Sequence, residues 1–146
     1  MIVIVTSLSA LFGALPAQVQ RFDLTAAAPD PTTFDLSAVL PGVQFQATTV
    51  RVVASTAAVT TLLVGGVDNT YPAYNGVVIY GSVAAGASKL NVIGSVALPG
   101  SGAGVTALSQ TSPLHPGFVL AATDTGVYKC ADQPGCGVRE FAASSP

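Results

Sequence analysis

The feature that most constrains this chain is a unit of four short apolar runs, separated by turn residues, that recurs along the sequence. Leu40-Pro41-Gly42 returns 58 residues later as Leu98-Pro99-Gly100, and a new apolar run follows each copy within a few residues. A regular period of this kind is typical of proteins that stack one supersecondary unit on the next. The sequence therefore predicts a repeat protein.

The strands of each unit are predicted from β-branched and aromatic runs bounded by Gly, Pro, Asn and Asp. In the middle unit the predicted strands are residues 48–54, 61–67, 76–81 and 90–98. In the last unit they are residues 105–111, 117–123, 126–131 and 137–143. The first unit is less regular, and its predicted strands are residues 10–15 or 18–24 and an outer strand at 34–40. No window shows a sustained helical period.

Four strands per unit, with the fourth leading directly into the next unit, match the meander of a β-propeller blade. Stacked blades bury both faces of their inner strands, which explains why "TTLLVGGV" (60–67) is apolar throughout instead of alternating. We therefore predict one all-β repeat domain of four-stranded, antiparallel, propeller-like blades, with a β-sandwich as the alternative. Residues 43–100 and 101–146 would form two complete blades, and residues 1–42 part of a third.

The first 17 residues, "MIVIVTSLSALFGALPA", admit two interpretations. An apolar centre and a small residue before Gln18 are typical of a signal peptide, but the positively charged start is missing. Alternatively, residues 3–12 align without gaps with residues 119–128, at an offset of twice 58. We favour this second interpretation, in which the chain begins inside a blade at its second strand.

Residues 115–130, "HPGFVLAATDTGVYKC", resemble the second and third strands of a sialidase-type or sortilin-type (BNR-repeat) propeller blade. In that family a Ser-x-Asp-x-Gly box followed by an aromatic residue closes the next turn. Here Cys130, Asp132, Gly135 and Phe141 occupy comparable places, with cysteine at the serine position and extra residues in the loop. The middle unit lacks the box, so the resemblance is strongest over residues 105–141, where it implies a propeller fold.

The composition bears on partners and compartment. Only 8% of the residues are charged, against roughly a quarter in ordinary soluble domains, and Ser, Thr and Gly replace them. This composition favours a secreted or cell-surface β protein. Five basic residues are scattered among seven acidic ones, so the sequence has no basic stripe and nucleic-acid binding is not expected. The sequence also contains no uninterrupted run of about 18 apolar residues, so we predict no transmembrane helix.

Cys130 and Cys136 are the only two cysteines, and they flank a turn-forming segment between two predicted strands. A hairpin there could bring the two sulfurs within bonding distance, so we predict a disulfide, with two separate buried thiols as the alternative. A structural zinc site needs four N or S donors, and His115 is the only histidine. We predict no metal and no cofactor.

No set of residues predicts catalysis. Glycoside hydrolysis needs two facing carboxylates, or a tyrosine nucleophile with an acid and a base. Sialidases of the resembling fold also carry an arginine triad, whereas Arg51 is alone near the start of its strand and Thr106 is at about the equivalent place in the last unit. We interpret Arg51 as a solvated residue or as one that forms hydrogen bonds between blades. His115 lies in a proline-flanked turn, and the glycine-rich loop 100–104 lacks a following Gly-Lys-Ser/Thr.

The segment "VDNTYPAYNG" (67–76) is an insertion relative to the short "TDTG" turn (123–126) of the last unit. Tyrosine rings can stack on a sugar or protein surface while amide groups orient it, although loop insertions are also simply tolerated. We predict that any ligand binds at these loop residues: Asp68, Asn69, Tyr71, Tyr74 and Asn75.

These features predict a secreted or surface-exposed β-repeat module with a structural or binding role, its ligand a glycan or a protein. Two bare apolar faces would remain at its ends, so we expect it to assemble with further copies of itself or with the rest of a longer propeller. Two alternatives stay open. One is a fragment of a sialidase-like glycoside hydrolase. The other is a subunit of an extracellular filament, in which the apolar strand "MIVIV" completes a neighbour's sheet.

Overall fold

A computed structural model describes the following parts of the chain. The backbone is described for residues 2–6, 9–10, 13–14, 18–22, 32–35, 45–69, 75–87, 89–98, 104–109, 118–131 and 136–142. Side chains are described for residues 45–69, 75–87, 89–98, 104–109 and 118–130. The elements in these residues are all β-strands. Over the same ranges, no helix is long and apolar enough to cross a lipid bilayer.

Two four-stranded antiparallel meanders make up the middle and the end of the chain. The middle sheet consists of β6 (Phe45–Ser55), β7 (Val59–Asp68), β8 (Asn75–Ala84) and β9 (Asn91–Leu98), in that order. The C-terminal sheet consists of β10 (Val105–Leu108), β11 (Phe118–Thr123), β12 (Gly126–Ala131) and β13 (Cys136–Ala142). Each of the eight strands overlaps a predicted one, and the all-β class is confirmed.

The N-terminal part forms a smaller, three-stranded sheet in the order β1 (Ile2–Thr6), β4 (Gln18–Phe22), β5 (Thr32–Asp35). Between β1 and β4 lies a short hairpin of β2 (Ser9–Ala10) and β3 (Gly13–Ala14). The alignment with residues 119–128 placed the start of the chain at the second strand of a blade. In the structure β1 pairs with β4 only after the hairpin of β2 and β3, so that Ile2 lies opposite Phe22.

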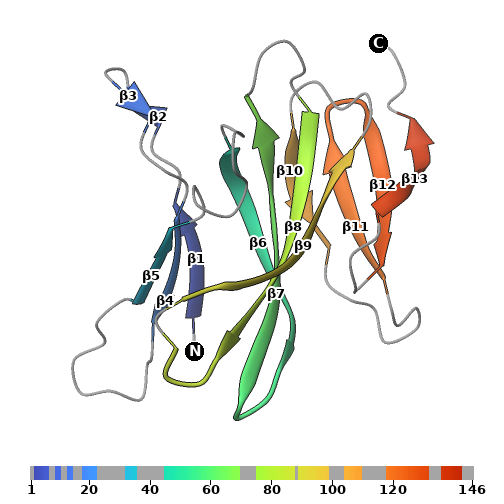
Figure 1. Ribbon diagram of the computed structural model, residues 1–146. Coiled ribbons are helices and arrows are strands. Elements are labelled where there is room, and N and C mark those ends of the chain that lie inside the picture. The colour runs from blue at the N-terminus through green and yellow to red at the C-terminus, as the bar shows by residue number, and fades with distance from the viewer. Residues whose placement is uncertain are drawn as a thin grey trace.

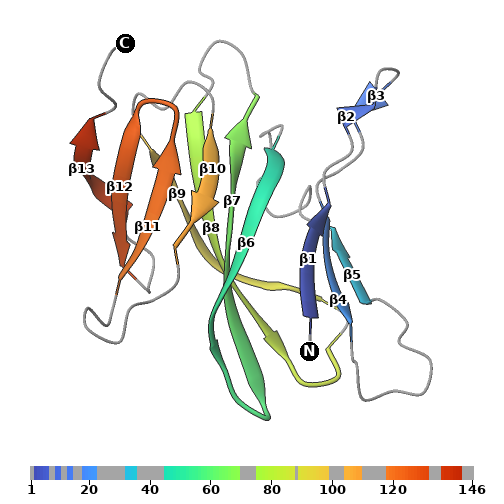
Figure 2. The same cartoon turned by 180° about the vertical axis from the view of Figure 1, so that it is seen from behind.

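The sheets follow one another in chain order (Figure 1). The N-terminal sheet contacts the middle sheet through β1 and β6, and the middle sheet packs on the C-terminal sheet through β6, β7 and β8 with β10. In Figure 1 β9 passes in front of the C-terminal sheet, and in Figure 2 it passes behind it. Open sheets packed in this way occur both in neighbouring propeller blades and in a β-sandwich.

The two inner strands of the middle sheet, β7 and β8, are largely apolar and are buried on both faces. On one face Leu62 and Val64 of β7 pack with Val77 and Ile79 of β8. The opposite face packs on the C-terminal sheet through a second buried cluster, which includes Leu63, Val78, Tyr80, Leu98, Val105, Leu108, Val119, Ala121, Tyr128 and Cys130. Successive side chains of a strand point to opposite faces, so a strand covered on both sides has no polar row. This arrangement accounts for the continuous apolar run at residues 60–67.

Glycines allow the middle and C-terminal sheets to approach closely. A Cβ atom at Gly65 of β7 would lie 2.6 Å from Cγ1 of Val105 in the next sheet. A Cβ atom at Gly104 would lie 2.6 Å from Cβ of Val67, and Gly104 also has a φ of +85°, which favours glycine. The first strand of the C-terminal sheet therefore rests almost directly on the backbone of β7.

Two side chains of β6 reach across to the backbone of β10. The Thr48 hydroxyl donates a hydrogen bond to the Val105 carbonyl, and Arg51 Nη2 donates one to the Leu108 carbonyl at 3.2 Å. Each of these hydrogen bonds joins two residues that are 57 positions apart in the sequence. Because the separation is the same for both bonds, β6 and β10 run in the same direction. Of the two interpretations of Arg51, a solvated residue or one that forms hydrogen bonds between units, the structure therefore shows the second.

Candidate functional site

The predicted ligand-binding residues lie at one end of the middle sheet, where β7 ends and β8 begins. Asp68 lies opposite Asn75 in the β7–β8 register and opposite Phe45 at the start of β6. Asp68, Asn69 and Asn75 are all half-buried. Three of the five predicted residues are therefore brought together at the base of one loop. Tyr71 and Tyr74 lie outside the described residues.

A fourth polar residue joins this group from the neighbouring strand. Asn69 Nδ2 donates a hydrogen bond to Gln46 Oε1 at 3.2 Å, and Gln46 is also half-buried. Sequence reasoning missed Gln46 because the residue is 23 positions away and belongs to another strand. Its only signal was a polar residue inside the apolar start of β6. The contact orients the Asn69 amide at the base of the loop.

The equivalent hairpin of the C-terminal sheet is a tight turn. Its Thr123 hydroxyl donates to the Gly126 carbonyl at 3.0 Å, and the Thr125 amide donates to the Thr123 hydroxyl at 3.3 Å. The β7–β8 and β11–β12 connections lie at the same end of the fold, where β6 and β10 also begin (Figure 1). The β7–β8 connection therefore begins and ends at the same end of the fold as the closed turn of the neighbouring unit.

The chemistry at this end is that of hydrogen bonding. Carboxylate and amide oxygens accept hydrogen bonds and amide nitrogens donate them, which suits the hydroxyl groups of a sugar or the backbone of a peptide. Among the side chains that the structure describes, no three His, Cys, Asp or Glu residues lie close enough together to hold a metal ion. His115 and residues 100–103 of the glycine-rich loop fall outside the described residues.

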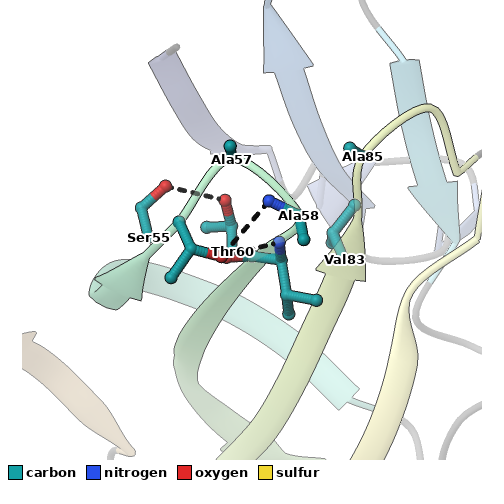
Figure 3. Close-up of a pocket in the computed structure, with 8 residues that line it drawn as sticks. Ser55, Ala57, Ala58, Thr60, Val83 and Ala85 are labelled. Atoms are coloured by element: carbon teal, nitrogen blue, oxygen red, sulfur yellow. Dashed lines mark hydrogen bonds between the residues drawn. The ribbon is translucent and has the colours of Figure 1, made fainter.

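A small hollow of about 180 Å³ lies at the opposite end of the middle sheet, beside the β6–β7 turn (Figure 3). The Thr56 hydroxyl accepts hydrogen bonds from the Ala58 and Val59 amides, at 3.3 and 3.0 Å. The Ala85 amide donates to the Ala58 carbonyl at 2.7 Å, which ties this turn to the end of β8. These polar groups stabilise the turn itself, so we assign the hollow a structural role.

The two cysteines are neighbours across β12 and β13. Cys130 lies directly opposite Cys136 in the antiparallel register, and the Cys130 side chain is fully buried. Residues directly opposite each other in such a pair have Cα atoms about 4.5–5.5 Å apart. That separation is within the range that a disulfide spans, so the strand register is compatible with the predicted bond.

The comparisons with known proteins bring no relative. No protein-family model matches the chain, and no curated protein or solved structure is significantly similar to it. The resemblance to sialidase-type and sortilin-type blades has no support from these comparisons.

Proposed function

We propose that this protein is an extracellular or cell-surface β-repeat module with a structural and binding role, whose sheets stack in the manner of propeller blades. The observation that carries the proposal is the parallel placement of β6 and β10 at a constant step of 57 residues. Rotation about a common axis moves the first strand of one blade onto that of the next without reversing it. A β-sandwich does not require equivalent strands of its two sheets to be parallel at a constant sequence offset.

The binding role rests on the polar end of the middle sheet. Asp68, Asn69 and Asn75 are held at the base of an insertion that also contains two tyrosines, and Gln46 orients the Asn69 amide. Aromatic rings that stack and amides that orient are a common means of recognising sugars and proteins. We propose that Tyr71 and Tyr74 supply the stacking surface for a glycan or protein ligand.

A double variant, Tyr71→Ala with Tyr74→Ala, tests this site. We expect it to lose binding on glycan and protein arrays while its melting temperature stays within about 2 °C of the parent, because surface substitutions usually change stability by less than about 0.5 kcal/mol. Asp124→Ala, in the tight turn of the equivalent hairpin, is the matched control and should bind like the parent. Equal binding by the double variant and the parent would remove the ligand site from this loop.

A disulfide between Cys130 and Cys136 fits the same proposal. Disulfides persist in oxidising compartments, and the strand register places the two residues opposite each other. The bond would join β12 to β13 next to the loop that connects them. It would therefore hold the last strand of the chain on its sheet.

A further inference from the structure

Strand β6 carries an extra residue near its start. The register of β6 and β7 steps past one position, because Ala47 pairs with Gly66 and Thr49 with Gly65. Thr48 is therefore the extra residue of a β-bulge. A bulge of this kind bends the strand and re-aims a side chain, and here the side chain that it re-aims is a hydroxyl.

The Thr48 hydroxyl lies within reach of two carbonyl groups. One is the Gly65 carbonyl of its own sheet, at 3.1 Å, and the other is the Val105 carbonyl of the C-terminal sheet. A hydroxyl carries a single proton, so it can donate to only one of the two carbonyls at a time. The hydrogen bond that joins the sheets thus has an alternative inside the middle sheet.

The C-terminal sheet repeats this bulge 58 positions later, at Thr106 of β10. Val105 pairs with Thr123 and Ala107 with Ala122, so Thr106 is again an extra residue. Its hydroxyl donates to the Ala122 carbonyl at 3.2 Å. Ala122 lies opposite the residue after the bulge, as the corresponding acceptor of the middle sheet does. The bulge, its threonine and the hydrogen bond within the sheet therefore recur at the period of the repeat.

The two threonines differ in the carbonyl that they use. Thr48 donates across the sheets to Val105, which is the residue directly before the next bulge. Thr106 donates within its own sheet. The same side chain at equivalent bulges is therefore seen in two arrangements, and one of them ties the first strand of a unit to the first strand of the next.

Directional contacts are needed to fix how the two sheets lie on each other. The buried cluster between them consists of apolar side chains, whose attraction is non-directional. Successive carbonyls of a strand point to opposite sides, so a shift of β10 by one residue would turn the acceptors of Thr48 and Arg51 away. A shift by two residues would move Val105 off Gly65 and onto neighbours that carry buried side chains.

We infer that the bulge threonine is the register-setting residue between the units of this repeat. Within its sheet the hydroxyl has an acceptor of its own, as Thr106 shows, so it is paired before two sheets meet. When the sheets dock, the hydroxyl of Thr48 transfers to the carbonyl before the next bulge and fixes Val105 on Gly65. The inference goes beyond the proposed function, because it concerns how two sheets of one chain are joined and holds with or without a ligand.

Nuclear magnetic resonance of the full chain tests the inference, because a nuclear Overhauser effect between the Val105 methyl groups and the Gly65 α-protons reports the register directly. Arg51→Met removes the second directional bond and should keep one set of signals for β10. Adding Thr48→Val removes the first bond while keeping the shape of the side chain, so we expect the β10 signals to double and the effect to be lost. Adding Thr48→Ser instead restores the donor and should restore the single set of signals.

Thr106→Val in the same Arg51→Met background is the matched control. It removes a threonine from the equivalent bulge but leaves the bond across the sheets, so it should behave like Arg51→Met alone. A single set of signals with the full effect in the Thr48→Val double variant would overturn the inference, as would equal disturbance by Thr106→Val.

Hydrogen exchange keeps the test decisive if the Thr48→Val double variant does not fold. In Thr48→Val with Arg51 intact, we expect the β10 amides to exchange about fivefold faster than in the parent, because one bond that holds this strand is lost. Thr48→Ser should exchange at the parent's rate. Equal rates in Thr48→Val and the parent would count against the role of the hydroxyl.

Discussion

Replacing Gly65 by alanine tests the close approach of the middle and C-terminal sheets. The added methyl group would lie 2.6 Å from Cγ1 of Val105 and 2.8 Å from Cγ2 of Thr49. Carbon atoms prefer separations of about 3.5–4.0 Å, so Val105 or the backbone that carries it must move by roughly 1 Å. Val105 is fully buried and belongs to the neighbouring sheet, so the movement spreads to the contact between sheets.

Two opposing effects set the size of the change. Overpacking a well-filled core typically costs about 1–3 kcal/mol, whereas replacing glycine stabilises by about 0.4–1 kcal/mol through the entropy of the unfolded chain. Because both contacts are far inside the normal separation, we take the upper part of the first range. The expected net loss in the free energy of unfolding is about 2 kcal/mol. For a chain of this length that corresponds to a fall in melting temperature of roughly 6 °C.

Urea unfolding followed by far-ultraviolet circular dichroism measures the effect, and a double-mutant cycle with Val105→Ala assigns it. The smaller residue leaves space for the methyl group, so the double variant should be more stable than the sum of the single changes by at least about 1 kcal/mol. Gly86→Ala is the control, because its position in the β8–β9 turn has a φ of +73° and no atom within 4 Å of the new methyl group. Its cost should add to that of Val105→Ala. If the costs of Gly65→Ala and Val105→Ala also simply add, the steric argument is refuted.

Two further predictions concern contacts between and within the sheets. Reduction of a Cys130–Cys136 disulfide should lower the free energy of unfolding by about 2 kcal/mol, as expected for a short closed loop. Non-reducing peptide mapping of protein from its native source checks the bond, and two free thiols would end the prediction. Thr48→Val removes the hydroxyl that donates across the sheets and should cost about 1 kcal/mol in urea unfolding. Thr106→Val, which removes an exposed bond within one sheet, should cost clearly less.

The strands of the middle and C-terminal units could be predicted from the sequence because their signals are local. β-branched runs form strands, and Gly, Asn, Asp and Pro end them, wherever the chain goes next. The apolar run before Asp68 also predicted that both faces of β7 are covered. The first unit was harder to predict. The hairpin of β2 and β3 delays the pairing of β1 with β4, and no short-range pattern in that region specified the delay.

What the sequence by itself determined is therefore the class of fold, the strands of the middle and C-terminal units, and the position of the β7–β8 connection. Only the tertiary structure decided which distant residues meet. Gln46 orients Asn69 because β6 lies beside β7, and Arg51 reaches the Leu108 carbonyl because β6 lies beside β10. The physical reason is that a strand's pattern of side chains specifies which faces are apolar but not which sheet covers them. How closely the backbones can approach is one determinant of that choice, and here Gly65 leaves room for Val105 of the C-terminal sheet.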